Sequence, residues 1–141
     1  MATGRGGIGA KRREGDGVTP LGVHRLVAVL HRPDRGSWHG AAAIGPCDGW
    51  ADDPVDPEYN RPVRRPHPFS HEALRRADPQ YDLVGVIDWN SAPVRPGAGS
   101  AVFLHIWRRP RHPTAGCIAF RREDLAWILA RWTPQSRVLV R

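Results

Sequence analysis

The hydrophobic positions of this chain fall into short runs separated by turn residues. Residues 23–31, 81–88, 100–107 and 118–120 carry alternating or β-branched apolar side chains, which is the pattern of strands. Residues 138–140 form a further apolar triplet that suits a short edge strand. The pattern therefore predicts a mostly β chain.

Only residues 122–132 have a helical pattern. Leu125, Ile128, Leu129 and Trp132 recur at the spacing of one helix face. Acidic residues near the start of this segment are favourable at a helix N-terminus. One clear helix is therefore expected beside the strands.

Two segments lack a regular pattern. Residues 1–10 are rich in Gly and are predicted to be a flexible lead-in, which leaves residues 11–141 as a single domain. Residues 47–68 are rich in Asp, Pro and Gly over a stretch longer than ordinary connections. Trp50 and Tyr59 within that stretch predict an ordered, packed loop without regular elements.

Composition limits the classes of protein that the chain can be. Its 141 residues suffice for one domain with a modest core, and no apolar run approaches the ~18 residues of a membrane span. The formal net charge of +7 comes from basic residues spread along the chain, of which Lys11 is the only lysine. No recognition motif accompanies this charge, so no nucleic-acid partner is expected. Residues 1–10 lack the apolar core of a signal peptide, which predicts a cytosolic protein unless the true start lies upstream.

No metal site is expected from the spacing of potential ligands. Neither Cys47 nor Cys117 has a second cysteine at metal-ligand spacing. Asp52, Asp53 and Asp56 lack the alternation of a calcium loop, and we interpret them as turn residues.

The best candidate for chemistry is Cys117, which follows Gly116 in a turn of small residues. His105 lies upstream, near the end of an apolar run. A thiol becomes a strong nucleophile as thiolate, which requires a nearby base or a positive field. Small residues before the thiol allow a sharp turn and leave backbone N–H groups free to bind an oxyanion. Taken alone, each residue suits a structural role; together they predict a nucleophile and its general base.

His71 has two interpretations. It is either a second active-site residue or the start of a helix capped by Ser70.

Two motifs follow one another along the chain. The first is Lys11 with Arg13-Glu14-Gly15-Asp16-Gly17 and Thr19-Pro20-Leu21-Gly22, and the second is Phe103-Leu104-His105 with Thr114-Ala115-Gly116-Cys117-Ile118. Together they resemble the signatures of the L,D-transpeptidase (YkuD-like) catalytic domain family. Trp50 with Asp52-Asp53, Tyr59-Asn60-Arg61-Pro62-Val63 and Ser70-His71-Glu72 resemble a short branch of that family. The resemblance extends from about Lys11 to Val140.

Two positions depart from the family pattern. The family usually carries Ser-His-Gly-Cys at the nucleophile, and here Thr114 keeps the hydroxyl whereas Ala115 replaces the His. Ala119 occupies the position of a common Arg that is associated with substrate handling.

The resemblance implies a mostly β, sandwich-like fold with one or two short helices, and acyl transfer on peptidoglycan stem peptides. Cys117 would attack the carbonyl that links a diamino acid to a terminal D-Ala, and His105 would take and return the proton. Backbone N–H groups of Gly116 and Cys117 would bind the oxyanion, and Thr114 is the candidate for orienting His105.

The same resemblance implies the partners and the setting. His71, Tyr59, Asn60 and Arg61 are the candidates for binding substrate, and no metal or organic cofactor is required. A monomer in the periplasm or cell wall is expected. Two other functions remain open: an L,D-carboxypeptidase or other Cys/His amide hydrolase, and a non-catalytic basic module that binds cell-wall polymer.

Overall fold

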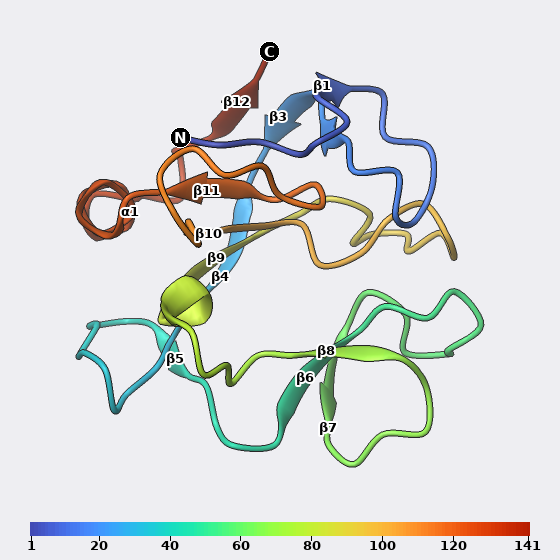
Figure 1. Cartoon of the computed structure of the whole chain (residues 1–141), viewed down its shortest axis with the longest axis horizontal. Coiled ribbons are helices and arrows are strands. Elements are labelled where there is room, and N and C mark those ends of the chain that lie inside the picture. Colours follow the sequence, from blue (N-terminus) through green and yellow to red (C-terminus); the bar gives the residue numbers. More distant parts are fainter.

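The centre of the protein is a five-stranded mixed sheet. A computed structural model describes all residues 1–141, and the strands of this sheet lie in the order β11-β10-β9-β4-β5 (Figure 1). They are β4 (Leu26–His31), β5 (Ala42–Ala43), β9 (Leu83–Ile87), β10 (Phe103–Ile106) and β11 (Ile118–Phe120). β9 is antiparallel to both β4 and β10, whereas β11 runs parallel to β10.

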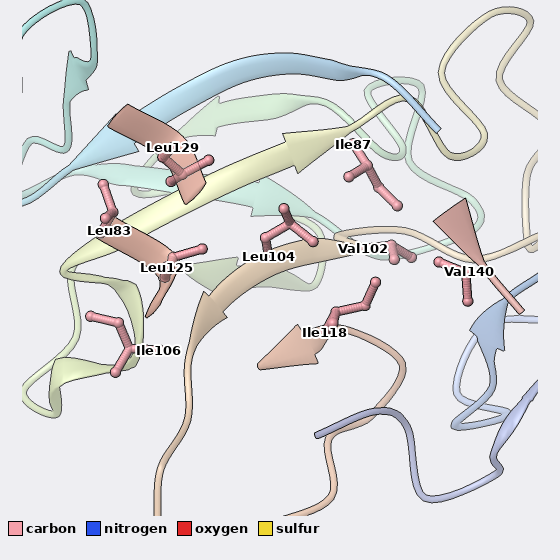
Figure 2. Close-up of a cluster of buried hydrophobic side chains, with 9 residues drawn as sticks. All are labelled: Leu83, Ile87, Val102, Leu104, Ile106, Ile118, Leu125, Leu129 and Val140. Carbon is pink, nitrogen blue, oxygen red and sulfur yellow. The ribbon is translucent and has the colours of Figure 1, made fainter. Parts of the chain in front are cut away.

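One face of this sheet packs against the single α-helix, α1 (Arg122–Ala130). Leu125 and Leu129 of the helix contact the sheet, and Figure 2 shows them facing side chains of β9 and β10. The cluster comprises Leu83, Ile87, Val102, Leu104, Ile106, Ile118, Leu125, Leu129 and Val140. The predicted helix is confirmed, and it ends two residues early, before the Thr-Pro step that follows Trp132. No helix in the structure has the length and apolar character that crossing a membrane requires.

The opposite face of the sheet is covered by a second, three-stranded sheet in the order β7-β6-β8. Its strands are β6 (Asp48–Ala51), β7 (Pro62–Arg64) and β8 (His71–Ala73), and they lie together at one side of the central sheet in Figure 1. Trp50 of β6 meets Phe103 of β10 edge-on, with ring centroids 5.1 Å apart. The two sheets thus form the expected mostly β, layered fold.

This second sheet corrects two expectations. The segment 47–68 is ordered and packed as predicted, but it contains two regular strands, which are too short for alternation to reveal. His71 begins β8, so the interpretation of this residue as the start of a capped helix is wrong.

Other predicted strands are confirmed with altered limits. The stretch 23–31 is divided between β3 (Gly22–His24) and β4, which belong to different sheets. β3 pairs with β12 (Val138–Val140), the predicted edge strand. The stretch 81–88 begins inside a 3-10 turn, η1 (Pro79–Tyr81), and becomes strand only at β9.

The N-terminal residues, for which the sequence predicts a flexible lead-in, pair with segments distant along the chain. Ala2 exchanges two backbone hydrogen bonds with Ala119, of 2.7 and 2.8 Å, and Gly4 bridges to Thr114. Residues Ile8–Gly9 (β1) then pair with Thr19–Pro20 (β2). Small side chains permit this close backbone packing, so the composition that suggested flexibility instead allows the segment to pack beside residues 114–119.

Candidate active site

Parallel pairing of β10 and β11 brings the two predicted catalytic residues to one place. Leu104 pairs with Ile118 and His105 pairs with Ala119, so Cys117, immediately before β11, lies beside the start of β10. Both Cys117 and His105 line one cavity of about 400 Å³. The loop between the two strands therefore brings Cys117 back to the strand that carries His105.

The Cys117 thiol is held against the residues that lead into β10. Its Sγ donates a hydrogen bond to the Ala101 carbonyl at 3.1 Å and accepts one from the Phe103 N–H at 3.4 Å. Burial raises the pKa of the thiol to about 12, while the Phe103 N–H lowers it. The Glu72 carboxylate raises this pKa further and the Lys11 ammonium lowers it. The resting cysteine is therefore a neutral thiol.

The tautomer and protonation state of His105 suit a general base. Its Nδ1 lies 2.8 Å from the Ile106 carbonyl oxygen; a carbonyl only accepts, so Nδ1 carries the hydrogen and Nε2 keeps its lone pair. Burial lowers the pKa of the imidazole, which favours this neutral form. No hydrogen bond joins His105 to Cys117, and the thiol donates to the Ala101 carbonyl instead. His105 and Cys117 share the cavity, and a proton transfer between them would require the thiol to leave that carbonyl.

The turn before Cys117 is closed by Thr114. Its hydroxyl donates to the Cys117 carbonyl at 2.6 Å and accepts from the Gly116 N–H at 3.1 Å. The Gly116 φ of +143° is one that side chains disfavour. The Cys117 N–H takes part in no backbone hydrogen bond and is free to bind an oxyanion, whereas the Gly116 N–H is already engaged.

The expectation that Thr114 orients His105 is therefore wrong. The Thr114 hydroxyl is bonded within its own turn, and its carbonyl accepts from the Arg5 N–H at 2.9 Å. The Ile106 carbonyl orients the imidazole instead.

Tyr81 is the main cavity residue that the sequence did not single out. Its ring lies edge-on to the His105 ring, with centroids 5.5 Å apart at 79°. Its hydroxyl donates to Glu72 Oε1 at 2.7 Å, and the Arg76 guanidinium lies 5.1 Å from its ring centre. Because Tyr81 begins the apolar run 81–88, the sequence pattern gives it only the role of an ordinary strand residue.

The four residues expected to bind substrate do not line this cavity. The Tyr59 hydroxyl donates to Glu14 and accepts from the Gly99 N–H at 3.0 Å, and Tyr59 is fully buried. Asn60 is also buried, and its side-chain oxygen accepts the Ala101 N–H at 3.1 Å. Arg61 is exposed, while His71 Nδ1 lies 2.8 Å from the Phe69 carbonyl oxygen. Tyr59 and Asn60 thus support the backbone behind the thiol rather than facing the cavity.

The two departures from the family pattern lie on either side of the nucleophile. Ala115 lines the cavity, and Ala119 is completely buried where it pairs with Ala2. Positive charge at the cavity comes instead from Lys11, Arg76 and Arg108.

In this mostly β domain, a cysteine just before one strand and a histidine on the neighbouring parallel strand line one cavity. A thiol nucleophile and its base require such an arrangement. Residues 1–140 match the L,D-transpeptidase catalytic domain (YkuD), and the chain belongs to this family. No curated protein and no solved structure matches the chain.

Proposed function

We propose that the protein is a peptidoglycan L,D-transpeptidase that forms a thioester between Cys117 and a stem-peptide diamino acid. The observation that supports this most strongly is the shared cavity, in which a free Cys117 N–H adjoins the thiol and His105 has an unprotonated Nε2. Membership of the L,D-transpeptidase catalytic domain family supports the choice of reaction.

In the first half-reaction, the Cys117 proton passes to His105 Nε2 and Sγ attacks the carbonyl carbon before the terminal D-Ala. The Cys117 N–H stabilises the oxyanion, and one such donor is worth about 3–4 kcal/mol in comparable enzymes. Collapse breaks the C–N bond as His105 returns its proton to the departing amine. D-Ala leaves and a thioester remains.

In the second half-reaction, an amine from a neighbouring stem attacks the thioester. His105 takes a proton from this amine, the C–S bond breaks, and the thiol regains the proton. The products are a crosslinked peptide and the free enzyme. Because peptidoglycan is assembled outside the cytoplasmic membrane, we propose that the domain acts in the periplasm or cell wall as a monomer.

The test is intact-mass analysis after exposure to a carbapenem, a thiol-reactive acyl donor. We expect one adduct on the wild-type chain and on a Cys47→Ser variant, because Cys47 is exposed and outside the cavity. A Cys117→Ser variant is expected to carry none. The absence of any adduct on Cys117 contradicts the proposed nucleophile.

The acceptor is tested by incubating the protein with tetrapeptide muropeptides. Transpeptidation predicts crosslinked products and released D-Ala by mass spectrometry. Trimmed tripeptides alone would assign a carboxypeptidase, in which water replaces the amine. Unchanged muropeptides together with salt-sensitive binding to polymer would assign a non-catalytic binding module.

A further inference from the structure

Lys11 is a buried cation with a fixed position. Its side chain is 3% exposed, and Nζ donates to Asp16 Oδ1 at 2.7 Å and to the Val18 carbonyl at 3.4 Å. Lys11 lines the cavity that contains Cys117, whereas Asp16 does not. The ion pair therefore presents its positive end to the catalytic turn.

Two glycines make room for this side chain. A Cβ at Gly99 would lie 2.2 Å from Lys11 Cε, and Gly99 has a φ of +106°. A Cβ at Gly116 would lie 3.4 Å from Lys11 Nζ. The lysine thus passes against Gly99 and ends beside the residue that precedes the nucleophile.

Asp16 fixes the ammonium in this place. Besides Lys11, its carboxylate accepts the backbone N–H groups of Arg12, Arg13 and Val18 at 2.9 to 3.2 Å. These bonds hold the pKa of Asp16 well below its usual range despite the opposing effect of burial, so the carboxylate stays charged. The Lys11–Asp16 pair therefore holds the ammonium beside the turn that precedes Cys117.

We propose that Lys11 is a positioning residue whose ammonium stabilises the anionic form of Cys117 as the thiol proton leaves. Its use in catalysis rests on the proposed function, but the ionisation of the thiol can be measured without any acyl donor. Lys11 places a single charge beside this turn, which has no other buried cation next to it.

Other charged and titratable groups face the same cavity. They are Glu14, Asp52, Glu72, Arg76, Tyr81, His105, Arg108 and His112. Among them the Glu72 carboxylate acts against Lys11, because it raises the pKa of Cys117. Arg76 is already paired with Asp78 at 2.7 Å. Lys11 is therefore the cation that we expect to offset burial and Glu72.

The experiment measures the rate of iodoacetamide alkylation of Cys117 between pH 7 and 10 in a Cys47→Ser background. Below the thiol pKa this rate is proportional to the thiolate fraction, so a displacement of the profile by one pH unit is a tenfold change. We expect Lys11→Met to slow alkylation about tenfold. Arg13→Met is the matched control, because it removes an exposed positive charge from the same segment.

Asp16→Asn separates electrostatics from loosening of the structure. Asp16→Asn removes the negative charge that is paired with the Lys11 ammonium, so it should speed alkylation of Cys117 while Lys11→Met slows it. A general loosening of the structure would instead speed alkylation in both variants. If Lys11→Met does not fold, the Lys11→Met/Asp16→Asn double variant is compared with Asp16→Asn. This comparison measures the effect of the lysine in a background without the half-buried carboxylate. The proposal is overturned if Lys11→Met is alkylated as fast as Arg13→Met or faster, or if the double variant is alkylated as fast as Asp16→Asn or faster. Either result counts whether or not carbapenem acylation occurs.

Discussion

The ring of Tyr81 packs edge-on against the imidazole of His105, on the side of the sheet that carries the thiol. The same ring also meets Phe103 edge-on, with centroids 5.9 Å apart. Tyr81 therefore connects His105, the proposed base, to the aromatic core between the two sheets, and its ring lies where it limits the rotation of the imidazole.

Replacing Tyr81 should affect catalysis through this contact. We expect Tyr81→Ala to lower the acylation rate at least tenfold and the free energy of unfolding by about 3–5 kcal/mol, because a large buried ring is lost. Tyr81→Phe keeps the ring and loses the hydroxyl donated to Glu72, so its rate should stay near wild type. Carbapenem acylation and urea unfolding measure the two effects. An alanine variant that acylates at the wild-type rate would show that the contact does not position the base.

His105→Ala should slow acylation of Cys117 by about 10² to 10⁴-fold, the usual contribution of a general base. The fold should persist, because the neighbouring Leu104 and Ile106 provide the core contacts of β10. The control is His39→Ala, which removes an exposed histidine far from the cavity lining. Equal time courses of carbapenem labelling for the two variants would refute the role of His105.

Thr114→Val should loosen the catalytic turn. This substitution removes both hydrogen bonds of the hydroxyl, at a cost of about 1–2 kcal/mol in unfolding free energy, and we expect the acylation rate to fall about tenfold. Thr114→Ser keeps the hydroxyl and should recover the rate. If the valine variant is as active as the serine variant, the hydroxyl is dispensable for the reaction.

The raised pKa of Cys117 predicts a loss of stability in alkaline solution. In the unfolded chain the thiol ionises near its ordinary pKa of about 9, whereas in the folded chain it stays neutral to about 12. Between these values the unfolded state binds fewer protons, so the free energy of unfolding falls as pH rises, by at most about 1.4 kcal/mol per pH unit. Cys117→Ser lacks this contribution. The measurement is the difference in urea stability between the two proteins from pH 8 to 11, and a constant difference would contradict the raised pKa.

Those parts of the fold with several consecutive positions of one period could be predicted from the sequence. The helix from Arg122 keeps its period over nine residues, and β9 and β10 lie within the longer apolar runs 81–88 and 100–107. The strands β6 and β7 lie instead among Asp, Pro and Gly residues, where no longer apolar run reveals the alternation. At the division of 23–31 into two strands, the Arg25 N–H donates to the Asp88 carboxylate at 3.0 Å, a contact between residues far apart in the sequence.

The candidate site was predictable where motif and chemistry coincide. Cys117 and His105 were found because their residue types suit acyl transfer and their motif resembles a family signature. The contacts of Thr114 and the burial of Tyr59 and Asn60 could not be foreseen, since hydrogen-bond partners come from segments distant in sequence. Lys11 was visible as part of a motif, but only the fold places it beside Gly116.

The pairing of Ala2 with Ala119 and of Gly4 with Thr114 also bears on how the reactive centre matures. These contacts join the beginning of the chain to its last quarter, and such distant contacts form late in folding because a long loop must first close. During synthesis, Cys117 is therefore added to the chain long after Lys11, its proposed stabilising partner. The segments on both sides of Cys117 therefore gain their N-terminal partners only when the two ends of the chain have come together.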